Sequence, residues 1–368
     1  MLKTRNATRR EFLAACSAGL LARGPFAAAG EFQKPAAGEF RRGGMVYRRL
    51  GQTDMDVSLL SFGSHTDPAD RRRAGHGKTV LTAEGQARRD RIIAHAFDLG
   101  VNLLDVYASE GQWEPAARLV RDRRDKILVS LAHEMTPKDI DEAVRLFGYV
   151  DLYRFGVQEI DQRALEDWDL LRKAKEAGKI RAIGISTHVE RTMTLALDEL
   201  EGIDYIIFPY NFIHARADYS QFLPRALRKG VGLIAMKPLA SGSIMKLDPR
   251  ARAGAKPEFD DLQLWQRGNK PILPAAVADL TASLSRMPDE TLCMAAMRFV
   301  YSRPFLAAAV TGMFEDRLLG DNYKALTRYW EMRPEEQAAL GTAKRLASLC
   351  GANWLRPGYR WLEEQWLG

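Results

Sequence analysis

Short apolar runs alternate with helical patterns along most of this chain. The run at residues 101–107, for example, follows a helical spacing of apolar side chains over residues 83–99 and a glycine at position 100. Strands that alternate with helices in this way are typical of a parallel α/β fold, because each helix must cover the sheet. Eight runs have this strand character, at residues 57–62, 101–107, 127–133, 150–157, 181–186, 205–211, 232–239 and 307–314.

Eight alternating units predict a closed (β/α)8 TIM barrel, which we place at residues 46–330. The competing fold is an open, doubly wound sheet. No Gly-x-Gly-x-x-Gly follows the first run, and that motif is the usual nucleotide-binding device of the open fold. The pattern therefore favours the barrel.

Several segments lie outside the regular alternation. Residues 45–49 and the turn at 51–54 predict an N-terminal hairpin, and the basic residues 66–82 predict an exposed loop. Roughly fifty residues separate the seventh strand from the next helix; such an insertion is either a lid beside the catalytic face or surface decoration. Residues 331–368 predict a C-terminal helix and an aromatic tail.

The first thirty residues resemble a twin-arginine export signal. Arg9 and Arg10 precede a modest apolar run at residues 13–22, and small residues follow it. The alternative is a basic, disordered terminus; a stable membrane anchor is not expected, because about 20 apolar residues are needed to span a bilayer. We read residues 1–30 as the signal and 31–45 as a linker, and expect export to the periplasm through the twin-arginine machinery.

Charge and cysteine content exclude several classes of function. The formal net charge of +7 falls to +3 once the leader's net +4 is removed, which is too little to indicate nucleic-acid binding. Cys16, Cys293 and Cys350 form no metal-binding spacing, so we expect no metal site and no iron–sulfur cluster. The sequence does not decide whether Cys293 and Cys350 pair in a disulfide.

The segment Gly100-Val-Asn-Leu-Leu-Asp-Val-Tyr-Ala-Ser-Glu-Gly-Gln-Trp-Glu114 resembles the signature of the aldo-keto reductases. In that family the aspartate supports a lysine, and a tyrosine five residues later donates a proton to the substrate. Asp105 and Gly111 match the signature, but Glu110 stands at the tyrosine position. The resemblance implies a TIM barrel with an altered proton donor.

Two other catalytic positions of the family also differ. Ala132 stands where the resemblance places the lysine and Gly156 where it places a histidine. The catalytic candidates are therefore the polar residues at the ends of the second and third strands, namely Asp105, Tyr107, Glu110 and His133.

These candidates allow more than one chemistry. Tyr107 or His133 is a candidate proton donor, and Glu110 is another if burial raises the pKa of its carboxyl. The alternative is that Tyr107 and His133 are packing residues. A buried Asp105 without the lysine needs a new partner, so we predict a contact with His133 or Tyr107 and expect Glu110 to face the same cavity.

The resemblance also implies a nicotinamide dinucleotide, NAD(P), with no preference between NAD and NADP. Ser186 matches a carboxamide-binding position, whereas Thr187 and Ile207 replace the family's asparagine and glutamine. The cofactor-binding candidates are Ser186, Lys237, Pro238, Leu239, Gly242, Gly312, Arg317 and Asn322.

Together these features predict an NAD(P)-dependent oxidoreductase. Its reaction would interconvert a carbonyl and an alcohol on a small, possibly sugar-like molecule, with a non-standard proton donor. The alternative is a catalytically silent barrel that binds a ligand or a partner protein.

Overall fold

The computed structural model describes residues 38–74, 79–132, 136–211, 217, 220–239, 290–328, 334 and 338. The predicted signal and linker, most of the insertion after the seventh strand and almost all of the C-terminal segment lie outside these ranges, so their structure stays a prediction. All the described residues belong to one compact unit, which spans Pro35–Gly368.

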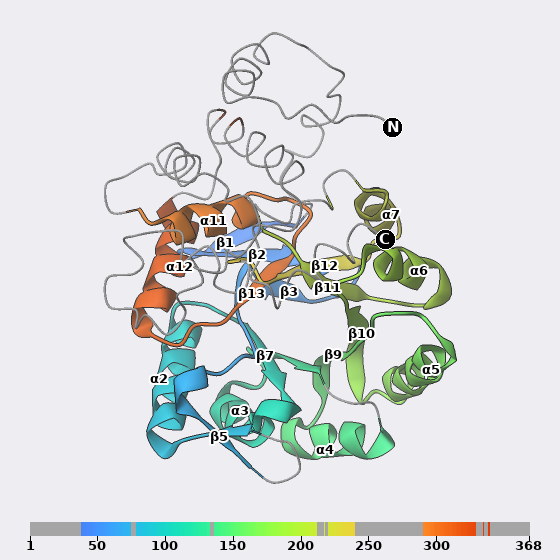
Figure 1. The fold of residues 1–368 in the computed structure, drawn as a ribbon, viewed down its shortest axis with the longest axis horizontal. Helices are drawn as coiled ribbons and strands as arrows, with labels where there is room; N and C mark the ends of the chain where they lie inside the picture. The colour runs from blue at the N-terminus through green and yellow to red at the C-terminus, as the bar shows by residue number, and fades with distance from the viewer. Residues whose placement is uncertain are drawn as a thin grey trace, which may run out of the picture. The chain divides into compact units, whose positions relative to one another are not determined.

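Eight parallel strands close into a barrel in the order β10-β11-β12-β13-β4-β7-β8-β9 (Figure 1). This confirms the predicted (β/α)8 fold. The barrel strands are β4 (Leu60–Phe62), β7 (Leu103–Tyr107), β8 (Leu128–Ala132), β9 (Val150–Gly156), β10 (Ile180–Ser186), β11 (Tyr205–Pro209), β12 (Gly232–Met236) and β13 (Ala308–Thr311).

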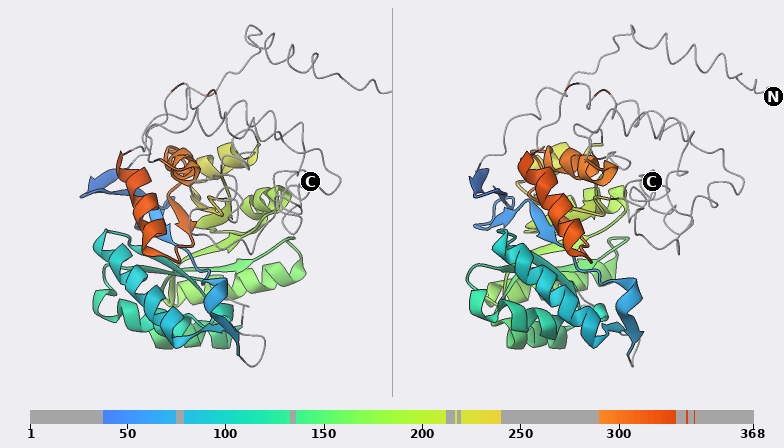
Figure 2. Two further views of the ribbon diagram at one scale, coloured as in Figure 1. Left: turned by 60° about the vertical axis from the view of Figure 1, so that its left-hand side comes forward. Right: turned by 90° about the vertical axis from the view of Figure 1, so that its left-hand side faces the viewer.

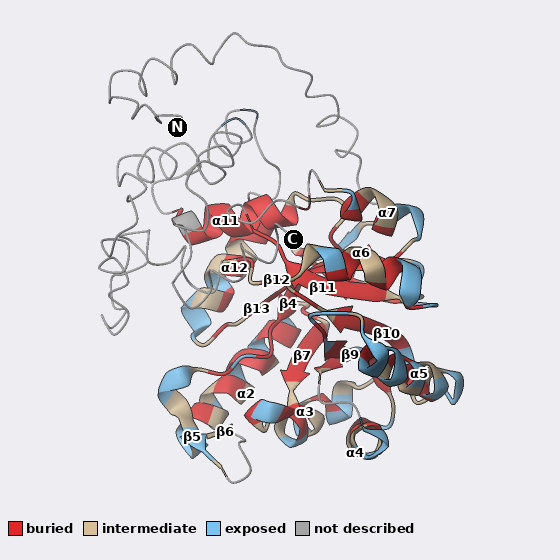
Figure 3. Cartoon of the chain, turned by 45° about the vertical axis from the view of Figure 1, so that its right-hand side comes forward, coloured by how far each residue is buried: buried red, intermediate tan, exposed pale blue. Residues whose placement is uncertain are grey.

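Helices cover the outside of the barrel. Most of them are buried on the inner face and exposed on the outer face, whereas the described residues of α11 (Leu292–Tyr301) are all buried (Figure 3). Two of them, α2 and α12, lie side by side on one flank (Figure 2). The helices are α2 (Ala83–Asp98), α3 (Trp113–Val120), α4 (Pro137–Phe147), α5 (Gln162–Glu176), α6 (Glu190–Glu199), α7 (Phe222–Arg228), α11 (Leu292–Tyr301) and α12 (Asp316–Arg328).

Local sequence sets where helices begin and end. The Thr82 hydroxyl accepts a hydrogen bond from the Gly85 amide at the start of α2, and Thr136 and Asp139 form a reciprocal capping box at the start of α4. The chain after α2 turns at Gly100, whose φ of 96° favours glycine. The turn delivers β7 directly after the helix.

The predicted N-terminal hairpin is present as β2 (Met45–Arg49) and β3 (Asp56–Ser58), which pair antiparallel. Its apolar side chains pack against residues of the barrel interior, including Leu103 and Leu152, so the hairpin closes the amino-terminal end of the barrel. A third strand, β1 (Phe40–Arg42), pairs with β2.

The prediction of an exposed loop over residues 66–82 is wrong for the described part of that segment. It contains a 3₁₀ turn, η2 (Pro68–Asp70), and a hairpin of β5 (Arg71–Arg73) and β6 (Thr79–Leu81). The reason lies in tertiary contacts, because the side chain of Arg71 reaches the carboxylate of Glu110.

Candidate active site

The carboxyl ends of β7, β8, β9 and β10 lie next to one another and form one wall of the barrel mouth. The backbone register pairs Tyr107 with Ala132, Ala132 with Arg154, and Gly156 with Ser186. Among the residues that the structure describes, a Cβ atom built on Gly156 meets only Ser186 Oγ, at 3.8 Å. Catalytic residues of (β/α)8 enzymes come from this end of the strands, and here Tyr107 lies beside three small residues, Ala132, Gly156 and Ser186.

Below the mouth, Asp105 is buried in a hydrogen-bonded triad with Arg154 and Ser130. Arg154 Nη1 and Nη2 donate to the two Asp105 carboxylate oxygens at 2.5 and 2.9 Å, and Nη1 also donates to Ser130 Oγ at 2.8 Å. The Ser130 hydroxyl donates to Asp105 Oδ1 at 2.7 Å. Burial lowers the pKa of Arg154, but the Asp105 charge outweighs it and the net shift is upward. Arg154 is therefore charged.

The predicted contact between Asp105 and Tyr107 is wrong. Among the described residues the Asp105 oxygens bond to Arg154 and Ser130, with no hydrogen bond to Tyr107. His133, the other expected partner, lies outside the described residues. Arg154 was not among the residues predicted for the site. Its signal in the sequence was weak, since β9 also contains a second charged residue, Asp151.

The ring of Tyr107 lies between two other groups of the site. The Cζ atom of Arg154 is 5.7 Å from its ring centroid, and the His65 ring packs edge-to-face against it at 5.2 Å. Tyr205 from β11 also lies near Arg154. Burial raises the pKa of the Tyr205 hydroxyl, and the nearby Arg154 charge offsets only part of that effect, so Tyr205 stays protonated.

Glu110 is buried at the end of η3 (Ala108–Glu110), with 7% of its surface exposed. Its carboxylate accepts hydrogen bonds from the Thr66 amide at 2.6 Å, from the Thr66 hydroxyl, and from Arg71 Nη2 at 3.0 and 3.1 Å. His65 Nδ1 lies 2.9 Å from Glu110 Oε1.

This environment contradicts a raised pKa for Glu110. Burial raises the pKa of the carboxyl, but the hydrogen bonds from His65 and Thr66 and the charge of Arg71 outweigh burial, and the pKa is lowered. Glu110 is ionised at neutral pH, so it is not a proton donor there. It faces the segment that follows β4 rather than Asp105.

His65 is a second residue of the site that was not predicted from the sequence. It follows β4, and 58% of its side chain is exposed. Its sequence neighbours gave no signal, since the contact with Glu110 joins residues 45 positions apart. The structure places it at the mouth beside Tyr107.

The cofactor candidates are spread over the ends of β10, β12 and β13 and the start of α12. Ser186 is partly exposed at the end of β10, whereas Asn322 in α12 is buried. Lys237 follows β12 with a φ of 53°, and burial lowers the pKa of its amine to about 8. Pro238, Leu239 and Gly312 are also described, and Gly242 lies outside the described residues.

Arg317, the candidate for a 2′-phosphate, is engaged by two acids. Its Nη1 lies 3.1 Å from Asp321 and its Nε lies 3.9 Å from Glu315. The described residues contain no group of three or more side chains suited to a metal ion, and no helix among them is long and apolar enough to cross a membrane.

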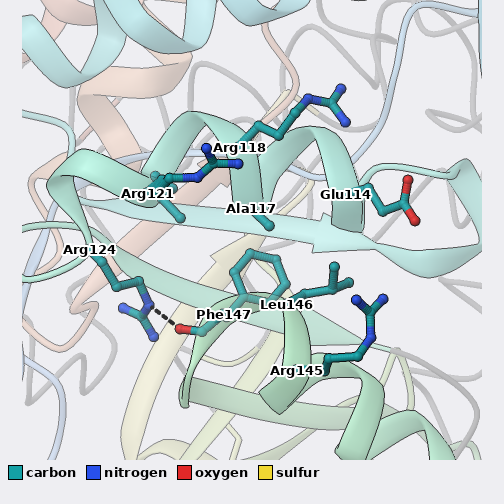
Figure 4. Close-up of a pocket in the computed structure, with 9 residues that line it drawn as sticks. Glu114, Ala117, Arg118, Arg121, Arg124, Arg145, Leu146 and Phe147 are labelled. Atoms are coloured by element: carbon teal, nitrogen blue, oxygen red, sulfur yellow. Dashed lines mark hydrogen bonds between the residues drawn. The ribbon is translucent and has the colours of Figure 1, made fainter.

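A groove of about 420 Å³ lies elsewhere, between α3 and α4 on the outside of the barrel (Figure 4). Arginines line it, including Arg118, Arg121 and Arg124. Arg124 donates to the carbonyl oxygens of Phe147 and Tyr149, so it holds the barrel together. None of the residues that line this groove belongs to the strand-end site described above.

Comparison with known proteins identifies the family. A model of the aldo/keto reductase family matches residues 82–340. The L-galactose dehydrogenase of Arabidopsis thaliana is 24% identical over 309 residues, which cover 76% of this chain and 88% of that protein. An L-glyceraldehyde 3-phosphate reductase of Escherichia coli O157:H7 is 28% identical over 232 residues, covering 55% of this chain and 64% of that protein.

Solved structures agree on the fold. An aldo-keto reductase from Bacillus halodurans, in its holo form, superposes with a TM-score of 0.61 at 20% identity and covers 81% of this chain and 95% of its own. The glycerol dehydrogenase of Gluconobacter oxydans gives a TM-score of 0.61 at 18% identity, covering 82% and 95%. These likenesses show the architecture, and the family model spans more than half of the sequence. The chain belongs to the aldo/keto reductase family.

Proposed function

We propose that this protein is a nicotinamide-dependent oxidoreductase that interconverts an alcohol and a carbonyl group on a small, sugar-like substrate, with a proton donor other than the family's tyrosine. Membership of the aldo/keto reductase family supports the reaction class. Two similar proteins are named for polyhydroxylated substrates, L-galactose and L-glyceraldehyde 3-phosphate, which supports the substrate class.

The observation that carries the proposal is the buried Asp105–Arg154 ion pair. The family's aspartate is retained, and a cation contacts it although the lysine position holds Ala132. Arg154 reaches Asp105 from β9, the strand that pairs with Ala132. A buried charge pair costs desolvation free energy and is weak evidence for stability alone. The presence of such a pair beneath the mouth, with Arg154 as the cation in place of a lysine, therefore supports a functional role.

The described residues at the mouth suit the cofactor. A bound nicotinamide would accept or supply the hydride. Ser186 would bond its polar substituent, the small side chains of Ala132 and Gly156 leave room beside the ring, and the Lys237 amine would approach the phosphates. Arg317 is already paired with Asp321, so we propose little preference for a 2′-phosphate and therefore use of NAD at least as readily as NADP.

Fluorescence titration of purified protein with NADH and NADPH tests the proposal, followed by assays with aldoses, glycerol and glyceraldehyde. We expect saturable binding of both cofactors and turnover of a polyhydroxylated substrate. An Arg118→Ala/Arg121→Ala variant of the outer groove is the matched control and should bind cofactor as the wild type does. Absence of binding at millimolar cofactor would favour the alternative, a silent barrel that binds a ligand or partner.

A further inference from the structure

We propose that His65, held by Glu110, is the group that transfers the proton in this site. This inference rests on the proposed oxidoreductase function. Its basis is a carboxylate–imidazole pair at the barrel mouth, formed by residues from two different strand-to-helix connections. Neither the family signature nor the comparisons assign a role to His65.

Glu110 is built to hold the imidazole in one state. The carboxylate is ionised and fixed by Thr66 and Arg71, so towards His65 it acts only as an acceptor. The neutral ring must then carry its proton on Nδ1, which donates to Glu110 Oε1 at 2.9 Å. That tautomer leaves a lone pair on Nε2, the arrangement of a general base oriented by a second group.

The position of His65 suits proton exchange with a ligand and with water. With 58% of its side chain exposed, the ring is open to solvent, and Nε2 makes no hydrogen bond within the described parts of the chain. The β4 strand that precedes His65 pairs with β7, which carries Asp105 and Tyr107. The imidazole therefore stands at the mouth, with the Asp105–Arg154 pair deeper in the barrel.

Tyr107 is the competing proton donor, but its observed contacts are packing contacts of its ring. Its ring packs against His65 on one side and lies near Arg154 on the other. Among the described residues no group hydrogen-bonds to the Tyr107 hydroxyl that could supply or remove its proton. His65 has such a partner, because its Nδ1 lies 2.9 Å from Glu110 Oε1.

The proposed step is balanced as follows. In alcohol oxidation the substrate hydroxyl proton passes to His65 Nε2, the O–H electrons form the carbonyl bond, and the hydride leaves the carbon for an oxidised nicotinamide. The imidazolium, paired with Glu110, then releases its proton to water from its exposed edge. In carbonyl reduction the imidazolium donates its Nε2 proton to the oxygen as the carbon receives hydride from the reduced nicotinamide.

The first test measures His65 itself and needs no substrate. Nitrogen-15 NMR of the full-length protein, with the signal assigned by its loss in His65→Asn, should show the neutral ring protonated on Nδ1. A neutral ring protonated on Nε2 would overturn the proposal, since no lone pair would then face the ligand.

The second test separates cofactor binding from chemistry. His65→Asn and Glu110→Gln should bind NADH within about twofold of the wild type, while kcat falls about 100-fold or more in His65→Asn, the usual scale for loss of a general acid–base group. Imidazole added to His65→Ala should restore part of the activity. The matched control is His95→Asn, which alters an exposed histidine 3.7 Å from Asp316 on the outer flank and should leave kcat unchanged.

The outcomes distinguish the two proposals. If the wild type binds no nicotinamide, the proposed function fails and this inference fails with it. If the wild type binds cofactor and turns over substrate, but His65→Asn keeps its kcat, only the assignment of His65 is wrong. A large loss in Tyr107→Phe together with a small loss in His65→Asn would give the proton transfer to Tyr107 instead.

Discussion

Arg154 donates hydrogen bonds to both carboxylate oxygens of the buried Asp105. Removing its guanidinium leaves a carboxylate inside the barrel whose one remaining hydrogen-bond partner among the described side chains is Ser130. We therefore expect Arg154→Met to destabilise the fold by about 3–5 kcal/mol, the usual effect of breaking a buried pair from one side. Urea denaturation at pH 7 measures it.

The control for Arg154 is Arg145→Met in α4. Arg145 is exposed and paired with Glu142 at the surface, so its replacement should not change the unfolding midpoint. A double variant, Asp105→Leu/Arg154→Leu, should lose less than the sum of the two single changes, because neither charge is then left alone. Additive losses would contradict the ion pair.

The contribution of Glu110 to the stability of the fold should depend on pH. The pKa of its carboxyl is lower in the folded protein than in the unfolded chain, so its contribution is present above the unfolded value of about 4.3 and is lost as pH falls through the folded value. The groups that face it are His65, Thr66 and Arg71. Glu110→Gln should therefore be less stable than the wild type at pH 7, and the difference should shrink below about pH 4.

Urea denaturation across pH 3 to 7 on both proteins measures this effect. Asp139→Asn, which changes an acid of the α4 capping box away from the mouth, shows how an unrelated carboxylate behaves. A difference between Glu110→Gln and the wild type that does not vary with pH would contradict the assigned ionisation.

Sequence alone supplied the positions of Asp105 and Glu110 but not the residues that contact them. The signature fixes where β7 ends, because an apolar run and a glycine loop are local features. The partners Arg154 and His65 are 49 and 45 residues away in the chain. An arginine in a strand reads the same whether it faces the interior or the helices, so only the closed barrel reveals the pairing.

The strands β10 and β11 pack closely at Gly184, and this packing predicts the effect of a substitution there. A Cβ atom on Gly184 of β10 would lie under 3.0 Å from the carbonyl oxygen of Tyr205 on β11. Backbone in the barrel wall cannot move aside cheaply, so Gly184→Ala should destabilise the protein by about 1–3 kcal/mol.

The matched glycine is Gly320 in α12, where an added Cβ meets nothing within 4 Å. There Gly→Ala should stabilise the protein by about 1 kcal/mol through helix propensity. Thermal unfolding of the two variants is the measurement, and the two shifts should have opposite sign. Equal shifts would contradict the close approach of β10 and β11.

Elements were predictable where their pattern is local. Each of the eight strands falls on a predicted apolar run, because buried parallel strands are apolar on both faces. The β5–β6 hairpin was not predictable, since Arg71-Arg72-Arg73 reads as solvent-exposed and its order depends on Glu110.

The twin-arginine export signal at residues 1–30 stays a prediction from the sequence. We expect replacement of Arg9 and Arg10 by lysine to keep the protein in the cytoplasm, because the twin-arginine machinery recognises the pair. Fractionation of cells expressing both forms tests this. Arg23→Lys, which changes an arginine outside the pair, is the control and should be exported; export of the double-lysine form would contradict the prediction.

The hairpin of β2 and β3 also determines how ligands exchange. It fills one end of the barrel with Leu50, Met55 and Val57, and Arg48 fastens it by donating to the carbonyl oxygens of Tyr301 and Leu306. Under the proposed function, the cofactor and the substrate therefore share one entrance. Whichever sits deeper must arrive first and depart last, so steady-state kinetics should follow a compulsory order, and the last product to leave should compete with the first reactant to bind.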